Sequence, residues 1–482
     1  MSALPRPSEA APARPAPYDP RYDPLTDPDP GAGRDYAPTW WVASAGAPPE
    51  DDGPIAGDVD CDVAVIGSGS TGVSTALYLA REHGLRAVVL EANRSAWGCS
   101  SRSGGQGQNA SGRLKRSQWI ARWGLDVAKA LDAEIRAGFE NFGALTREIA
   151  CDADPSGHWY VAHRPERLPA LKSECALMRE TFGYATRIVG ADELRRTVCD
   201  EREAAGALFE PEGIGVHPLK LTYGLLRKAR AHGARIHPAS PVQGWSQGSG
   251  GVQHLRTPGG TVRAKRVAIC TGGYTSPALS PLVKNRLMPI LSNSLVTRPL
   301  SDAELTATGF RSEAFLTDTR VLRFYYRLLR DGEQRRLQIG SRSAITGAHA
   351  EDAVHLKLLT DAIARKFPPL AGIDVANSWW GWVDVSHDMM PRIARPDPAR
   401  PVWYALGYGG NGVSFSTWAG KRLAERIVGK DAGRDVFKLP IYDSPLELPN
   451  VMGTVRSEAF APFRRLGQRM LYRWYWLRDE KL

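Results

Sequence analysis

A glycine-rich turn between an apolar strand and a helix constrains this chain more than any other feature. Residues 62–66 form the expected strand, and apolar residues at helical spacing then predict a helix that ends at Gly84. Between them lie three glycines at G-x-G-x-x-G spacing, which are Gly67, Gly69 and Gly72. A second apolar strand, 86–90, leads to Glu91. This order of elements predicts a βαβ unit that binds a dinucleotide.

Each part of this unit has a physical role. The first glycine permits the tight turn, the second lets the backbone approach a pyrophosphate, and the third lets helix and strand pack closely. The helix N-terminus offers free N–H groups and a positive dipole end to the phosphates. Glu91 lies where a carboxylate can accept both ribose hydroxyls. Because it would repel a 2′-phosphate, it argues against NADP.

Composition excludes several classes of protein. The 482 residues predict two or three lobes, and a net charge of +10 is spread along the chain without a nucleic-acid-binding signature. The six cysteines form no C-x-x-C pair, and the histidines form no metal-ligand cluster, so we expect reduced thiols, no metal and a cytoplasmic protein. No apolar run approaches the ~20 residues that span a bilayer, and the N-terminus lacks a signal-peptide pattern.

The expected domains are interleaved along the chain. Residues 1–57 form a Pro-rich arm, expected to be disordered or loosely draped, with Tyr36 and the pair Trp40 and Trp41 as its anchors. The remaining predicted parts are a discontinuous nucleotide-binding domain of 58–114, 206–285 and 376–435, a substrate domain of 115–205 and 286–375, and a C-terminal extension of 436–482. A plain NAD dehydrogenase usually keeps its nucleotide-binding half contiguous, so this interruption favours a flavoprotein.

Three further motifs accompany the βαβ unit. They are Trp97-Gly-Cys-Ser-Ser-Arg-Ser-Gly-Gly-Gln106, Ala268-Ile-Cys-Thr-Gly-Gly273 and Gly407-Tyr-Gly-Gly-Asn-Gly-Val413. Together, in this order, the four motifs resemble the glycine/D-amino-acid oxidase family of FAD-dependent amine oxidoreductases, and within it the gamma-glutamylputrescine oxidoreductases. The resemblance implies an α/β (α+β) fold: a Rossmann-like FAD-binding domain of the glutathione-reductase type with an interleaved antiparallel-sheet substrate domain.

The resemblance also implies a set of FAD contacts. They are Gly67, Gly69, Ser70, Thr71, Gly72, Glu91, Arg102, Gly104, Gly105, Gln106, Val242, Thr271, Gly272, Gly410, Asn411, Gly412 and Val413. The chain departs from the subfamily pattern at several positions. Asn411 replaces the usual histidine, which leaves a backbone role intact but not a side-chain role. No histidine lies in either loop that tethers FAD in some relatives, and Cys99 is the one alternative tether, so we expect non-covalent FAD.

The substrate side offers four candidate catalytic residues: Arg323, Tyr326, Trp382 and His387. The first two lie in a segment that resembles the family's Y-F-R strand, and His387 lies in a turn that resembles its T-x-D-x-x-P motif. An arginine can clamp a substrate carboxylate bidentately, and aromatic rings can cage and desolvate an amine. The alternative for each aromatic residue is a place in the core, and for His387 an exposed turn.

The expected C-terminal helix, 460–482, is amphipathic. One face carries Phe463, Leu466, Met470, Leu471, Trp474 and Leu477, and arginines lie opposite. Such a helix could bind a membrane surface, but the resemblance runs through it, so we expect it to pack on the body.

The resemblance implies oxidation of a primary or secondary amine to an imine, which water hydrolyses to an aldehyde or oxo acid. A gamma-glutamylputrescine-like or other omega-amine is the first expected substrate, with O2 as acceptor. The alternatives are a D-amino-acid or N-methyl-amino-acid oxidase, a dehydrogenase that donates electrons to a quinone or carrier protein, and a non-catalytic flavin-binding regulatory protein.

Overall fold

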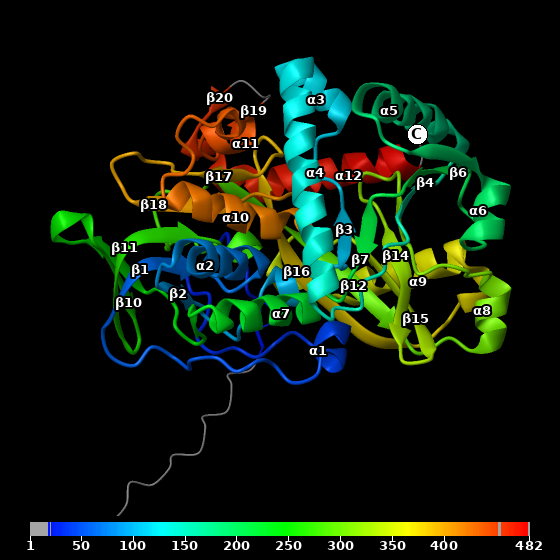
Figure 1. The fold of residues 1–482 in the computed structure, drawn as a ribbon. Coiled ribbons are helices and arrows are strands. Elements are labelled where there is room, and N and C mark those ends of the chain that lie inside the picture. The colour runs from blue at the N-terminus through cyan, green and yellow to red at the C-terminus, as the bar shows by residue number, and fades with distance from the viewer. Residues whose placement is uncertain (1–17, 20, 452–454, 481–482) are drawn as a thin grey trace, which may run out of the picture.

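Two eight-stranded sheets form the framework of the molecule (Figure 1). The computed structural model describes residues 18–19, 21–451 and 455–480. One sheet is mainly parallel and contains the predicted βαβ unit, whereas the other is mainly antiparallel. The expected mixed α/β fold, with a parallel sheet and an antiparallel substrate-domain sheet, is confirmed.

The parallel sheet has the strand order β17-β18-β11-β1-β2-β8, with β9 and β10 as an antiparallel extension of β11. Its buried central strands are almost entirely apolar, as expected for a sheet covered on both faces. The bounds are β1 (Val59–Ile66), β2 (Ala87–Leu90), β8 (Arg235–His237), β9 (Gly244–Gln247), β10 (Gln253–Thr257), β11 (Gly260–Ile269), β17 (Arg392–Ala394) and β18 (Val402–Leu406).

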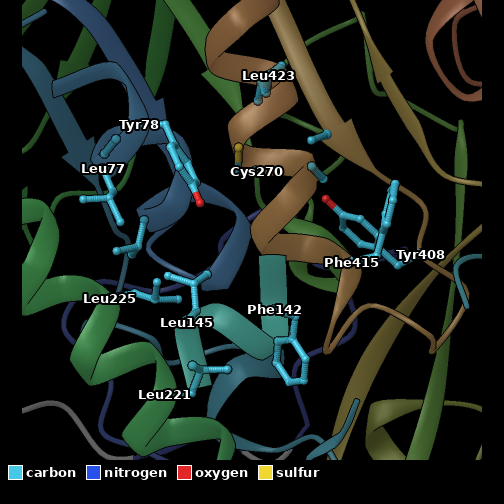
Figure 2. Packing of buried hydrophobic residues seen from close by; sticks show 14 of the residues in the cluster. Leu77, Tyr78, Phe142, Leu145, Leu221, Leu225, Cys270, Tyr408, Phe415 and Leu423 are labelled. Carbon is cyan, nitrogen blue, oxygen red and sulfur yellow. The ribbon is translucent and has the colours of Figure 1, made fainter. Parts of the chain in front are cut away.

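Three helices pack side by side over this sheet, with a long fourth helix across them (Figure 1). These are α2 (Ser70–His83), α7 (Pro218–Ala231), α10 (Phe415–Ile427) and α4 (Leu125–Glu148). Figure 2 shows how their apolar side chains interdigitate. Gly420 makes the α2–α10 approach possible, because a Cβ there would lie 2.6 Å from the Cβ of Ser74.

The second sheet has the order β16-β12-β15-β14-β13-β4-β6-β5, antiparallel except for the β13–β4 pair. Its bounds are β4 (His158–Ala162), β5 (Arg187–Gly190), β6 (Gly206–Glu210), β12 (Leu287–Thr297), β13 (Phe315–Asp318), β14 (Tyr325–Asp331), β15 (Gln334–Ser341) and β16 (Val375–Ser386). β6 and β16 lie in segments that we assigned to the nucleotide-binding domain, at 206 and 376. The chain therefore changes sheets a few residues later than expected, because both strands pair along the antiparallel sheet.

Shorter elements complete the molecule. The helices are α1 (Trp40–Ser44), α3 (Arg116–Trp123), α5 (Leu168–Phe182), α6 (Ala191–Thr197), α8 (Asp302–Thr308), α9 (Ala353–Lys366), α11 (Pro440–Asp443) and α12 (Arg464–Glu480). The strands are β3 (Gln106–Gln108), paired with β7 (Gly213–Gly215), and β19 (Asn450–Val451), paired with β20 (Val455–Arg456).

The described part of the N-terminal arm packs against the body. Tyr22 and Trp41 are buried, and the Trp41 indole N–H donates to the Ser103 carbonyl at 2.8 Å. Tyr36, an expected anchor, donates its hydroxyl to the Ser95 carbonyl at 2.6 Å. Our expectation of a loosely draped arm is therefore wrong for this part, because its aromatic side chains are buried. Residues 1–17 and 20 lie outside the described residues.

Helix α12 packs on the body, but with the opposite face to the expected one. Its inward side is polar: Gln468 and Asp479 are buried, and Arg465 forms an ion pair with Asp23. The apolar side chains predicted to pack inward are exposed instead. No helix within the described ranges has the length and apolar character required to cross a bilayer.

Candidate functional site

A cavity of about 710 Å³ runs between the two sheets. At one end it is lined by Glu91 and Val242, and it passes the glycine turn after β1. At the other end it lies under β12 and β14 of the antiparallel sheet, where Ser292 and Tyr325 line it. The carboxyl ends of parallel strands are where open α/β sheets bind nucleotides, so the cavity has the position expected of a dinucleotide site.

Two positions of the glycine turn leave no room for a side chain. Gly67 has φ +103°, and a Cβ on it would lie 2.6 Å from the carbonyl oxygen of Cys270. A Cβ on Gly72 would overlap the carbonyl oxygen of Gly67. Gly69 is the N-cap residue of α2 and, as a glycine, has no side chain that could cap the helix. Gly69, Ser70 and Thr71 line the cavity, so the helix N-terminus faces it. Free N–H groups and the positive end of the helix dipole suit a pyrophosphate there.

Glu91 has a second role that its position in the sequence did not reveal. Its carboxylate accepts hydrogen bonds from the Ser68 N–H at 2.9 Å, the Ser68 hydroxyl at 2.7 Å and the Asn93 N–H at 3.1 Å. It also lines the cavity. Glu91 therefore ties the first glycine turn to the end of β2 and presents its charge to the ribose end of the site.

Arg102 lies among aromatic rings. Its guanidinium carbon is 4.3 Å from the Trp97 ring centroid and 5.1 Å from that of Tyr274, and the side chain is 3% exposed. Nη2 is buried without a hydrogen-bond partner. Arg102 lines the cavity, so this unpaired N–H group is available to a ligand.

The loop after β18 closes the middle of the cavity. Gly409 and Gly410 adopt positive φ, and the Asn411 amide donates to the Gly112 carbonyl at 2.6 Å. Asn411 therefore fixes the loop through its side chain, a role that sequence reasoning left open. Helix α10 begins at Phe415, so Gly410–Val413 approach its N-terminus as a loop.

Most predicted cofactor residues converge on this one cavity. Those that line it are Gly67, Gly69, Ser70, Thr71, Glu91, Arg102, Gly104, Gln106, Val242, Thr271, Gly272, Gly410, Asn411, Gly412 and Val413. Gly72 and Gly105 lie behind the lining. Their lack of a side chain allows close approach to the carbonyl oxygens of Gly67 and Val216.

Strand alternation separates Tyr325 from Tyr326. Tyr325 lines the cavity, and its hydroxyl lies 2.6 Å from the Ser294 Oγ and 3.0 Å from the Ser292 Oγ. Tyr326, our candidate, points to the other side of β14 and is buried in the substrate-domain core against Phe367. Because neighbouring side chains in a strand face opposite ways, Tyr325 lies at the cavity and our candidate Tyr326 does not.

Two other candidates also lie outside the cavity lining. Trp382 is fully buried, and its indole N–H donates to the Tyr22 carbonyl at 3.0 Å, whereas its neighbours Gly381 and Val383 line the cavity. His387 lies beyond the end of β16, and burial lowers its pKa to about 4. Contrary to our expectation, neither residue lines the cavity.

Arg323 does line the cavity, together with Arg113 and Arg342, which the sequence analysis missed. Arg342 could have been found from the hairpin: β14 pairs with β15 so that Tyr325 faces Gly340, and the same register places residue 323 opposite residue 342. The Asp331-Gly332 turn signals that register in the sequence. Arg113 follows β3 in a distant segment, and no sequence signal connects it to the other two.

The three arginines form no ion pair with an acidic side chain within the described ranges. Arg342 donates to the Val321 carbonyl, and Arg113 donates to the Gly409 carbonyl at 3.5 Å. The pKa of Arg113 is lowered by the positive charge of Arg342, by burial and by Arg323. Three guanidinium groups without an acidic partner in the described residues make this end of the cavity suitable for an anion.

Two further groups in the lining have perturbed acidities. Burial raises the pKa of the Asp384 carboxyl to about 6, and its carboxylate accepts from the Gly407 N–H at 2.6 Å. Burial also raises the pKa of the Cys99 thiol to about 12, so the thiol is protonated at neutral pH. No group of His, Cys, Asp and Glu side chains suited to a metal ion occurs in the part of the chain that the structure describes.

Residues 62–426 match the family model described as FAD dependent oxidoreductase, so the chain belongs to this family of FAD-dependent amino acid and amine oxidoreductases. Among curated proteins it is similar to the gamma-glutamylputrescine oxidoreductase of Escherichia coli, with 31% identity over 80% of this chain and 88% of that protein.

Solved structures support the fold. The glycine oxidase of Geobacillus kaustophilus superposes with a TM-score of 0.67 at 20% identity, covering 80% of this chain and 98% of that one. The iminodiacetate oxidase of Chelativorans superposes with a TM-score of 0.64 at 18% identity, covering 80% and 98%. The glycine cradle, the open end of α2 and the unpaired Arg102 N–H group fit the FAD that the family binds.

Proposed function

We propose that this enzyme oxidises a primary or secondary amine that carries a carboxylate, with gamma-glutamylputrescine as the first candidate substrate. The single observation that carries the proposal is the group of three cavity arginines, Arg113, Arg323 and Arg342, without an acidic partner in the described residues. Guanidinium groups bind carboxylates bidentately and hold them in one orientation. The similarity to gamma-glutamylputrescine oxidoreductase supports the choice of amine, and with it a role in polyamine breakdown.

The bound FAD supplies the hydride acceptor, and the protein supplies position and protonation. In this proposal Arg323 and Arg342 hold the substrate carboxylate. The buried Tyr325 hydroxyl, fixed by Ser292 and Ser294, closes the cavity against water. Asp384, with its raised pKa, takes the proton from the substrate ammonium so that the neutral amine reacts. The product imine is then hydrolysed to an aldehyde or oxo acid.

Anaerobic flavin bleaching tests the proposal with a matched substrate pair. Putrescine shares the reacting amine of gamma-glutamylputrescine but lacks its carboxylate. We expect bleaching by the glutamylated amine at micromolar to millimolar concentration and little by putrescine. Bleaching by D-amino acids or N-methyl amino acids instead would favour the second candidate class. Flavin that no amine in the panel bleaches would contradict the proposal and favour a regulatory role.

We further propose that O2 is the acceptor, giving hydrogen peroxide, and that FAD is held non-covalently in the cytoplasm. The protonated Cys99 thiol supports non-covalent binding, and the six free cysteines fit a reducing compartment. Acid precipitation should release all flavin into the supernatant. If O2 reoxidises the reduced flavin more slowly than the enzyme turns over, the enzyme is instead a dehydrogenase that uses a quinone or carrier protein.

A further inference from the structure

Helix α12 is attached to the body through polar and charged groups. At its start, Arg464 donates to the Leu287 carbonyl at 2.9 Å and Arg465 donates to the Pro289 carbonyl at 3.0 Å. At its end, the Asp479 carboxylate accepts the backbone N–H of Val321 at 2.6 Å. These contacts fix the inward face of the helix without using its apolar side chains.

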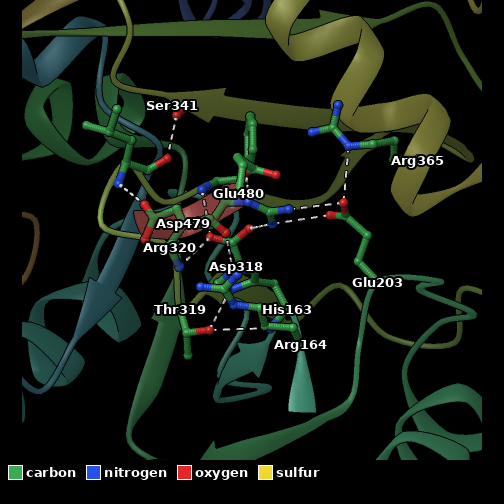
Figure 3. Close-up of polar contacts among 12 residues, drawn as sticks. His163, Arg164, Glu203, Asp318, Thr319, Arg320, Ser341, Arg365, Asp479 and Glu480 are labelled. Carbon is green, nitrogen blue, oxygen red and sulfur yellow. Dashed lines mark hydrogen bonds and ion pairs between the residues drawn. The ribbon is translucent and has the colours of Figure 1, made fainter. Parts of the chain in front are cut away.

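The end of α12 also belongs to the ion network in Figure 3. Glu480 accepts from Arg320 at 2.6 Å, and Arg320 pairs with Glu203 at 3.1 Å. The Asp479 contact holds the segment 321–322, directly before the cavity residue Arg323, and Arg342 donates to the Val321 carbonyl. The helix is therefore rigidly joined to the substrate end of the cavity.

The outward face of α12 is apolar, which reverses the usual arrangement of a surface helix. Met470 is 66% exposed and Phe463, just before the helix, is 63% exposed. Of the twelve large apolar side chains that are exposed within the described ranges, eight lie between residues 455 and 477. We call these eight residues the α12 patch: Val455, Phe463, Leu466, Met470, Leu471, Trp474, Trp476 and Leu477. Six of the eight lie on α12 itself, and such a concentration marks an interaction site.

The charge beside this patch is positive. Arg469 and Arg473 are exposed on the same helix, and neither forms an ion pair with an acidic group of the described residues. From residue 464 to residue 478 the helix contains five arginines and no acidic residue. An apolar face with tryptophan and leucine, flanked by arginine, is the pattern of a helix that lies in the headgroup region of an anionic bilayer.

Charge also argues against a second copy of the chain as the partner. A symmetric dimer through the patch would bring Arg469 and Arg473 of both protomers to one interface, and like charges there are unfavourable. We propose that the α12 patch docks this enzyme on the surface of an anionic phospholipid membrane. The substrate end of the cavity is then held near the bilayer surface, because α12 is joined to it.

Vesicle flotation of the FAD-loaded enzyme tests this inference. We expect binding to vesicles of phosphatidylglycerol and phosphatidylcholine, and little binding to phosphatidylcholine alone. The double variant M470E/W474E should lower the partition coefficient about tenfold or more, because it places charge in the apolar face. The matched control is V354E on α9, which alters another exposed apolar side chain and should bind as the wild type does. Both variants should retain flavin, since the altered side chains are exposed.

Three results would overturn the inference. One is no flotation with anionic vesicles. A second is flotation that M470E/W474E leaves unchanged, which would mean attraction by the net charge alone. The third is a wild-type dimer that the double variant converts to a monomer, without vesicle binding by either. None of these outcomes depends on amine oxidation, so the docking inference and the proposed function fail separately.

Discussion

Arg323 and Arg342 lie near each other because a hairpin brings them together across 19 residues of chain. Arg323 is the cleaner position to test, since its guanidinium donates no hydrogen bond to the described residues, whereas Arg342 and Arg113 each donate to a carbonyl. It lies over Tyr160, with 5.5 Å from the guanidinium carbon to the ring centroid. Its charge is thus available for substrate.

Replacing Arg323 by Met should weaken binding of the carboxylate. We expect KM for gamma-glutamylputrescine to rise about 30- to 150-fold, corresponding to about 2–3 kcal/mol for a hydrogen bond to a charged group, with a smaller change in kcat. R330M is the matched control, because Arg330 is exposed on the nearby strand β14 and pairs with Glu313. Steady-state kinetics that show equal losses for R323M and R330M would contradict the role of Arg323.

A substitution at Gly72 tests the glycine turn that faces the FAD pyrophosphate. In G72A the new methyl group would overlap the Gly67 carbonyl oxygen and displace the turn that faces the pyrophosphate. We expect the purified variant to contain less than about a tenth of the wild-type flavin, as measured by absorbance after denaturation. G190A is the control, since open space surrounds Gly190. Full flavin occupancy in G72A would refute the prediction.

At the scale of elements, a buried charge network joins α9 to β13 and α12. Lys366, at the end of α9, is fully buried and pairs with Glu203 at 2.9 Å, Asp318 at 3.3 Å and Glu201 at 3.5 Å. Buried charges need partners, because an unpaired one costs several kcal/mol. The network therefore fixes the helix against the sheet that roofs the cavity.

Glu203 makes the free energy of unfolding depend on pH. Burial alone would raise its pKa, but Lys366 and Arg320 outweigh burial and lower the pKa from 4.5 to about 2. Because the folded pKa lies below the unfolded one, the contribution is complete above about pH 4.5 and is lost as the pH falls towards 2. E203Q should therefore unfold more easily than wild type at pH 7, by on the order of 2–3 kcal/mol, with the difference vanishing near pH 2.

Urea unfolding of E203Q and wild type across this pH range measures the effect. E333Q, at an exposed position in the β14–β15 turn, is the control and should follow the wild type. A difference between E203Q and wild type that stays constant with pH would mean that packing, not ionisation, is responsible.

At the scale of the whole molecule, the N-terminal arm joins the two sheets at the cavity loop. Trp41 is 2% exposed, stacks edge-on against His217 at 4.9 Å and donates to Ser103. Trp379 of the antiparallel sheet donates to Arg102 in the same loop at 2.8 Å. The loop beside the flavin site thus depends on the arm.

W41A should destabilise the enzyme by about 3–5 kcal/mol, since it removes a large buried side chain and a hydrogen bond. We also expect weaker flavin retention, because the Ser103 carbonyl loses its donor. Thermal unfolding and flavin content are the measurements, with the exposed W474A as control. If W41A and W474A have equal melting temperatures, the arm does not stabilise the body.

The sequence by itself determined the family and the βαβ unit, and most of the residues that it predicted for the cofactor line one cavity. Gly67, Gly72 and the helix start are adjacent in the chain, so their spacing alone defines the turn. The order of motifs also predicted interleaved domains, whereas β6 and β16, which lie in segments assigned to the nucleotide-binding domain, pair in the antiparallel sheet.

Tertiary structure alone decided which side of each element faces the site. The choice between Tyr325 and Tyr326 depends on where the core lies, because a strand presents alternate residues to opposite sides. For α12 the polar face packed inward, since Asp23, Pro289 and Val321 offered partners that no pattern within the helix could reveal. Arg113 joined the other arginines through distant contacts. The spacing of apolar residues predicts that an element has two different faces. Which face packs inward, and which distant residues meet, is decided only when the whole chain folds.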